Sequence, residues 1–61
     1  MTEIFYPYNN TVGSIVVTVQ GSSYDNNELY VEYRGAEYIL HWDYARSYYT
    51  GTIQQHRGYV V

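Results

Sequence analysis

The sequence contains no cysteine and no lysine, and it has one proline and one methionine in 61 residues. Without cysteine the chain cannot form a disulfide, although a core of this size supplies only about 3–5 kcal/mol of stability and small domains often need such a brace. The same absences remove cysteine and lysine nucleophiles and the thiolate ligands of structural zinc sites. Much of the usual chemistry of small proteins is therefore excluded before any motif is considered.

Positive charge is scarce as well, because three arginines face six acidic residues and leave a net charge of −3. Nucleic-acid affinity depends mainly on lysine and arginine side chains that neutralise phosphates. Nucleic acid is therefore a poor candidate as a partner. We expect instead a partner protein that carries a basic patch.

Long apolar runs are also missing. No stretch approaches the roughly 18 apolar residues of a membrane span, and the first residues lack the basic and apolar regions of a secretion signal. We expect no membrane association and a cytoplasmic location, which is the host cell cytoplasm if the protein is viral. A chain of 61 residues without a visible linker or repeat is expected to form one domain over 1–61.

The abundant residue is tyrosine, which occurs ten times beside many glycines, serines and asparagines. Tyrosine offers a large, rigid contact at low entropic cost, and this composition is typical of antibody binding loops. Tyrosine also favours β-strands, where it covers half-buried sheet surface. Composition alone leaves open which tyrosines serve packing and which serve recognition.

The strongest local pattern spans residues 28–42, where two alternating stretches flank Gly35 and Ala36. A type II′ turn at these two residues predicts an antiparallel hairpin in which Arg34 lies opposite Glu37. Alternation then places six apolar or aromatic side chains together on one face, namely Leu29, Val31, Tyr33, Tyr38, Leu40 and Trp42.

The segments before the hairpin also favour strands. Residues 11–20 are rich in β-branched side chains and predict a strand, and residues 21–27 have the composition of a loop. The first eight residues alternate like a strand, but Pro7 has no amide hydrogen and confines this segment to a sheet edge or a bulge.

After the hairpin, Asp43 is a suitable N-cap for a short helical turn over 43–49. Residues 50–55 then predict another strand, and a turn at Gly58 would return the chain through its last three residues. The whole pattern predicts a mainly β fold: a small antiparallel sheet or a partly open barrel of four to five strands, with one short helical turn near 43–49.

Candidate catalytic groups are few. The serines stand in strand or turn contexts without a nearby histidine, and no Gly-x-Ser-x-Gly motif or phosphate-binding loop is present. Glu32 and Glu37 are expected to be solvated on the sheet surface, while His41 and His56 lack the spacing of metal ligands. We therefore expect no enzyme activity, no catalytic residue, no metal and no cofactor.

The remaining function is binding. We predict a small protein-binding inhibitor or adaptor that acts through a tyrosine-rich acidic surface, of the kind that viruses or mobile elements encode to block a host enzyme. The expected binding residues are those in the predicted loop and helical turn and on the outer hairpin face: Tyr24, Tyr30, Glu32, Tyr44, Arg46, Tyr48 and Tyr49.

Two other functions fit the same residues. One is a self-assembling structural subunit, and the other is a module that stacks tyrosine and tryptophan on sugars or on single-stranded nucleic acid. A homodimer is expected, formed through an exposed strand edge or through an outer face that is too apolar to be fully solvated. That face carries Val12, Val16, Thr18, Tyr30 and Ile39.

Overall fold

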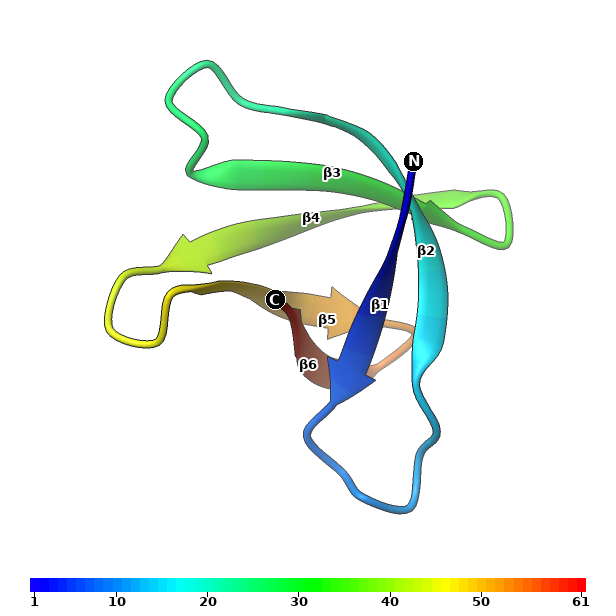
Figure 1. The fold of residues 1–61 in the computed structure, drawn as a ribbon. Coiled ribbons are helices and arrows are strands. Elements are labelled where there is room, and N and C mark those ends of the chain that lie inside the picture. The colour runs from blue at the N-terminus through cyan, green and yellow to red at the C-terminus, as the bar shows by residue number, and fades with distance from the viewer.

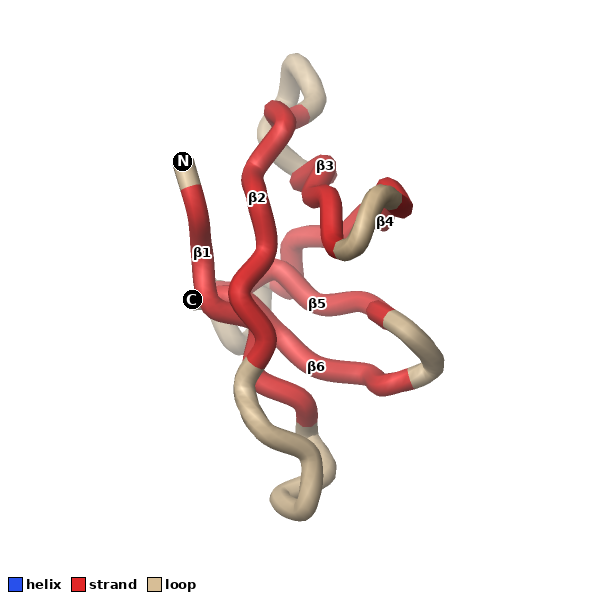
Figure 2. The backbone as a smooth tube through the Cα atoms, turned by 90° about the vertical axis from the view of Figure 1, so that its right-hand side faces the viewer, coloured by secondary structure: helices blue, strands red, loops and turns tan.

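The computed structural model describes residues 1–61 as six antiparallel strands and no helix (Figures 1 and 2). The strands follow one another around a closed barrel, and the last strand pairs with the first. Their bounds are β1 Thr2–Pro7, β2 Ile15–Ser22, β3 Glu28–Tyr33, β4 Ala36–Asp43, β5 Tyr48–Ile53 and β6 His56–Val60. The predicted antiparallel β fold is confirmed, but the predicted four to five strands and the partly open barrel are wrong.

Each strand contributes one side chain to the buried core. The six buried hydrophobic residues are Phe5, Val17, Val31, Leu40, Ile53 and Val60. A ring of partly buried residues packs against them: Ile15, Val19, Leu29, Tyr33, Tyr38 and Tyr49. Because the core is this small, the barrel depends on contributions from all six strands.

The hairpin of β3 and β4 turns at Arg34 and Gly35, whose φ angles are 52° and 79°. Positive φ at both central residues identifies a type I′ turn, so the predicted type II′ turn at Gly35 and Ala36 is wrong. Tyr33 pairs with Ala36, and the register is shifted by two residues from the prediction. Because side chains alternate with a period of two, this shift leaves the predicted inner face intact.

The segment predicted as a short helical turn is a four-residue loop, Tyr44 to Ser47, between β4 and β5. The Asp43 carboxylate accepts hydrogen bonds from the amides of Ala45 and Arg46 at 3.0 and 3.3 Å, as an N-cap does. Ser47 then adopts a φ of 58°, which ends the turn and directs the chain into β5. Asp43 therefore makes the hydrogen bonds of an N-cap, but the predicted helical turn is wrong because no helix follows it.

Gly58 lies inside β6 and not in a turn, since the β5–β6 hairpin turns at Gln54 and Gln55. A Cβ atom at Gly58 would lie 2.4 Å from the Tyr6 carbonyl oxygen and 2.6 Å from the Phe5 ring. Only glycine therefore lets β6 approach β1 closely enough to close the barrel. The predicted turn at Gly58 is therefore wrong: the last strand begins at His56 and passes through Gly58 to pair with β1.

The predicted edge or bulge position of the first strand is wrong, because β1 pairs with both β2 and β6, and Pro7 is compatible with this closed sheet. It pairs with Gly58, while the ladder between β1 and β2 ends at Phe5 and Ile15. The next amide, that of Tyr8, donates to the Arg57 carbonyl of β6 at 2.9 Å. Since successive amides point to opposite sides of a strand, Pro7 lacks its hydrogen on the side where no ladder remains.

The chain contains no helix long and apolar enough to cross a membrane.

Candidate binding surfaces

Four tyrosines gather on one outer face of the barrel: Tyr6 in β1, Tyr8 just after β1, Tyr48 in β5 and Tyr59 in β6. We call them the tyrosine patch. Tyr59 is at its centre, stacked on Tyr48 with ring centroids 4.5 Å apart. The rings of Tyr6 and Tyr8 lie 5.5 and 5.7 Å from that of Tyr59. Aromatic pairs at such distances stabilise one another beyond their area burial.

Strand alternation explains why these tyrosines face outward. Phe5 and Val60 point into the core, so their neighbours Tyr6 and Tyr59 point away from it. The patch itself depends on the pairing of β1 with β6, because its members lie far apart in the sequence.

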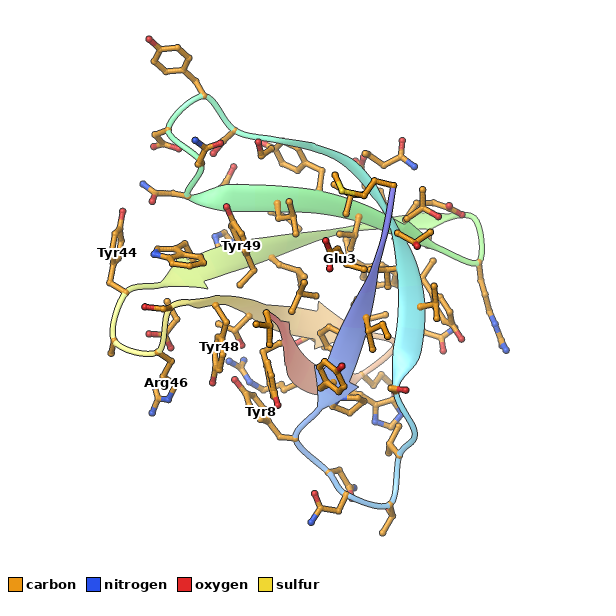
Figure 3. The ribbon with its side chains drawn as sticks, viewed as in Figure 1. Glu3, Tyr8, Tyr44, Arg46, Tyr48 and Tyr49 are labelled. Carbon is orange, nitrogen blue, oxygen red and sulfur yellow. The ribbon has the colours of Figure 1, made fainter.

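A chain of hydroxyl groups connects the patch. The hydroxyl oxygens of Tyr8 and Tyr48 are 2.8 Å apart although the residues are 40 positions apart in sequence. The Tyr8 hydroxyl also lies 3.1 Å from the Thr50 hydroxyl, which donates to the Gly58 carbonyl at 2.7 Å. The hydrogen bond with Tyr8, aided by partial desolvation, raises the pKa of Tyr48 above its ordinary value. Figure 3 shows the side chains of Tyr8 and Tyr48 meeting at their hydroxyl ends.

An ion pair lies beside the patch. Arg46 places its guanidinium nitrogen 3.0 Å from a carboxylate oxygen of Asp43. Partial desolvation acts to raise the pKa of Asp43, but the hydrogen bonds from the Arg46 side chain and from the turn amides outweigh it and lower that pKa. Both groups are therefore charged at neutral pH, and the pair holds the β4–β5 loop.

A second surface is a cleft of about 250 Å³ between the β2–β3 loop and the β4–β5 hairpin. We call it the aromatic cleft, and its lining residues are Asp25, Asn26, Asn27, Trp42, Tyr44 and Tyr49. Trp42 and Tyr49 pair across β4 and β5, and Tyr44 follows in the loop. In Figure 3 the side chains of Tyr44 and Tyr49 point toward the β2–β3 loop, away from Tyr48 and Tyr8.

Hydrogen bonds join the two sides of the aromatic cleft. The Tyr49 hydroxyl donates to the Asn26 carbonyl at 2.8 Å, and the Tyr44 hydroxyl donates to the side-chain oxygen of Asn27. The Trp42 amide donates to the Asn27 carbonyl at 2.8 Å. These bonds hold the β2–β3 loop, residues 23–27, against the end of β4, although the loop contributes no buried core residue.

Asp25 supplies the charge of the cleft. Its carboxylate accepts hydrogen bonds from the Ser23 hydroxyl at 2.7 Å and from the Asn27 amide at 3.1 Å. These bonds, that from Ser23 first, lower the pKa of Asp25 below its ordinary value. The carboxylate is therefore ionised at neutral pH.

A smaller apolar cleft of about 170 Å³ lies on the other side of Trp42 and Tyr49. Its remaining lining residues are Met1, Glu3, Val19, Leu29, Ser47, Val60 and Val61. Glu3 is the one charged side chain among them and is partly buried on the inward side of β1. The residues fit an apolar group better than a polar one.

The seven predicted binding residues do not form one site. Tyr48 and Arg46 lie at or beside the tyrosine patch, whereas Tyr44 and Tyr49 line the aromatic cleft. Tyr24 is fully exposed in the β2–β3 loop and belongs to neither surface.

Tyr30 and Glu32 lie on the outer side of β3, apart from both surfaces. The Tyr30 hydroxyl donates to the Glu28 carboxylate at 2.9 Å, which raises the pKa of Tyr30. The Glu32 carboxylate accepts a hydrogen bond from the Gly35 amide at 2.7 Å and so stabilises the β3–β4 turn. Each of these residues has a structural partner within its own hairpin.

Three of the four patch tyrosines and four of the six residues that line the aromatic cleft were not predicted from the sequence. Tyr6, Tyr8 and Tyr59 were not predicted, because no local pattern reveals that β1 meets β6. Trp42 was assigned to the core, and Tyr24 was the one residue of the 21–27 loop predicted to bind, although Asp25, Asn26 and Asn27 line the cleft. The turn composition of 21–27, beside a hairpin that ends in Trp42, was the one signal available for the cleft.

The histidine, aspartate and glutamate side chains do not form a metal-binding cluster. The structure has no group of three or more histidine, aspartate or glutamate side chains placed around one point. His41 lies 3.9 Å from the Glu28 carboxylate, at the surface, and is the only histidine with such a partner.

Comparison of the chain with protein-family models, with curated proteins and with solved structures finds no match. The function is therefore argued from the two surfaces themselves.

Proposed function

We propose that the protein is a small protein-binding inhibitor or adaptor whose main contact surface is the tyrosine patch. The observation that supports this function most strongly is the gathering of four outward tyrosines on one face by the pairing of β1 with β6. None of the four belongs to the buried core, so packing alone does not require them there.

The patch has the properties of a protein-recognition surface. Its rings are held by stacking and by hydroxyl contacts, so little side-chain entropy remains to be lost on binding. Tyrosine is enriched among residues that dominate binding energy in protein interfaces. The patch is also built on strands and lies outside both clefts, which suits a protein partner better than a small ligand.

The partner is proposed to carry a basic surface, because the chain has a net charge of −3 and a partner of opposite charge associates faster. Two arginines lie near the patch, Arg46, which is paired with Asp43, and Arg57 on β6, so the attraction for a basic partner comes from the net charge of the chain and not from the patch itself. The proposed biological setting is a virus or mobile element whose protein blocks a host enzyme in the cytoplasm of the host cell.

Affinity capture with matched variants tests this function. The double variant Tyr6→Ser, Tyr8→Ser removes the two most exposed rings of the patch and is expected to lose at least nine-tenths of the captured partner, about a tenfold loss of affinity. The control is Ile39→Ser in β4, since Ile39 is 46% exposed and Tyr8 is 48% exposed. Thermal melting shows that the variants are folded. Equal capture by the wild type and the double variant would refute the proposal.

Self-association through the same face is the second candidate. Beside Tyr6, the cross-strand pair of Ile4 and Val16 is also outward, and Val16 is 59% exposed. Together they extend the patch with apolar surface of the kind found in homodimer interfaces. A free strand edge does not contribute, because every strand has a neighbour on both sides. Sedimentation equilibrium with Val16→Ser distinguishes the two uses: a dimer that this variant dissociates indicates self-association.

A further inference from the structure

The aromatic cleft differs in chemistry from the tyrosine patch. Its rings meet edge to face: the planes of Trp42 and Tyr44 make an angle of 89° with centroids 6.5 Å apart, and those of Trp42 and Tyr49 make 66° at 4.9 Å. Sugars and bases stack on a flat ring face, whereas rings that meet at right angles form the walls of a cage. Aromatic cages of this kind suit compact organic cations, which are attracted to the electron-rich ring faces.

The hydrogen-bonding groups of the cleft favour a cation as well. The hydroxyl hydrogens of Tyr44 and Tyr49 are donated to Asn27 and to the Asn26 carbonyl. The Asn27 side-chain amide donates to Asp25 at 3.2 Å. The two tyrosine hydroxyls and the Asn27 side-chain amide thus donate within the protein, while the Asp25 carboxylate accepts three hydrogen bonds and keeps acceptor capacity for a ligand. A ligand that brings positive charge and donors fits this carboxylate.

Charge complementarity points the same way. The six lining residues include one carboxylate and no lysine, arginine or histidine. The net charge of −3 adds a long-range attraction for cations. An anion or a neutral sugar would gain nothing from this field.

We propose that the aromatic cleft binds an alkylammonium group, the side chain of lysine or methylated lysine, presented by a partner protein. The ammonium head lies among Trp42, Tyr44 and Tyr49 and close to the Asp25 carboxylate. The cleft is separate from the tyrosine patch and rests on the proposed function only in naming a protein as the source of the cation.

Trp42 is the single tryptophan of the chain and lines both clefts, so its fluorescence reports binding, and substitution of Tyr44, which lines only the aromatic cleft, identifies the occupied cleft. The probes are the N-acetyl methylamides of lysine and of trimethyllysine, and a neutral isostere that carries a tert-butyl group in place of the trimethylammonium. The expected result is a saturable change with the cations and a dissociation constant at least fivefold weaker for the isostere. Equal binding of the isostere, or binding of oligosaccharides in place of cations, would overturn the proposal.

Two variants locate the cation. Tyr44 is 74% exposed, so Tyr44→Ala leaves the fold intact and is expected to weaken trimethyllysine binding about fivefold, the order of a cation–π contact at an exposed site. Tyr44→Phe keeps the ring and should restore most of the affinity. Asp25→Asn is expected to weaken binding about threefold. Its control, Glu37→Gln at the far end of β4, makes the same change in net charge and should leave affinity unchanged.

The double variant Tyr6→Ser, Tyr8→Ser separates this proposal from the proposed function. It should bind trimethyllysine as the wild type does, because its changes lie outside the aromatic cleft. Binding of phosphatidylcholine vesicles without binding of a trimethyllysine peptide would overturn the assignment of the cation to a protein.

Discussion

The tyrosine patch and the aromatic cleft use the same residue type for different purposes. In the patch, the hydroxyls of Tyr8 and Tyr48 contact each other and the rings lie side by side on paired strands. In the cleft, the hydroxyls of Tyr44 and Tyr49 are bonded to the β2–β3 loop and the rings form walls. The comparison shows that topology, and not composition, decides whether a tyrosine contributes to a flat surface or to a cavity.

The two regions also differ in charge. Two of the three arginines lie near the patch: Arg46 beside it, and Arg57 two positions before Tyr59 on the same side of β6. The cleft contains the Asp25 carboxylate and no basic residue. A partner's basic side chains are therefore expected at the cleft, and its aromatic and aliphatic side chains at the patch.

The largest predicted effect comes from a substitution at the pairing of β1 with β6, which is the seam that closes the barrel and supports the patch. Gly58→Ala places a methyl group against the Tyr6 carbonyl and the Phe5 ring, and backbone cannot move aside cheaply. We expect a loss of about 3 kcal/mol in the free energy of unfolding, the upper end for overpacking a core. Urea denaturation measures it. The control is Gly13→Ala, where a Cβ atom meets nothing within 4 Å; a Gly58→Ala protein as stable as this control would contradict the described seam.

A smaller effect compares a patch tyrosine with a loop tyrosine. Tyr59→Ala removes three aromatic contacts, and each is worth about 0.5–1.5 kcal/mol, so we expect a destabilisation of about 2 kcal/mol. Tyr24→Ala removes a fully exposed ring and should change stability by less than about 0.5 kcal/mol. Similar unfolding midpoints for the two variants would show that the patch is not packed as described.

The smallest predicted effect is a change in the pH dependence of stability. It concerns the β4–β5 loop, which lies between the two regions. The pKa of Asp43 is lower in the folded chain than in the unfolded one, so its contribution to stability is present above the unfolded value near pH 4 and is lost as the pH falls through the folded value. Asp43→Asn should therefore flatten the fall in melting temperature between about pH 5 and pH 2. A fall as steep as that of the wild type would contradict the ion pair with Arg46.

Local pattern predicted the β3–β4 hairpin and its inner face, because alternation survives a register shift of two residues. It did not predict the turn type, since Arg34 at a φ of 52° is unusual for a residue with a side chain. The helical turn failed because the cap at Asp43 is local information, whereas the return into β5 is imposed by pairing with β4 and β6.

The candidate surfaces were predictable only in part, for the same reason. Tyr44 and Tyr48 were identified by their place between strands, but alternation and the loop put them on different surfaces. Tyr59 and Tyr8 had no local signal in the sequence, because their roles depend on contacts between the first and the last strand of the barrel. Gly58 looked like a turn residue, and its requirement for close approach becomes visible only when Phe5 is placed beneath it.

The most direct test of the central claim, that closure of β1 on β6 assembles the tyrosine patch, is a two-dimensional NOE spectrum of the wild-type protein. The closed barrel predicts cross-peaks between the ring protons of Tyr6 and Tyr59 and between those of Tyr8 and Tyr59. Their absence, in a spectrum that does contain the β1–β2 contacts of Glu3 with Val17, would contradict the closure and with it the patch.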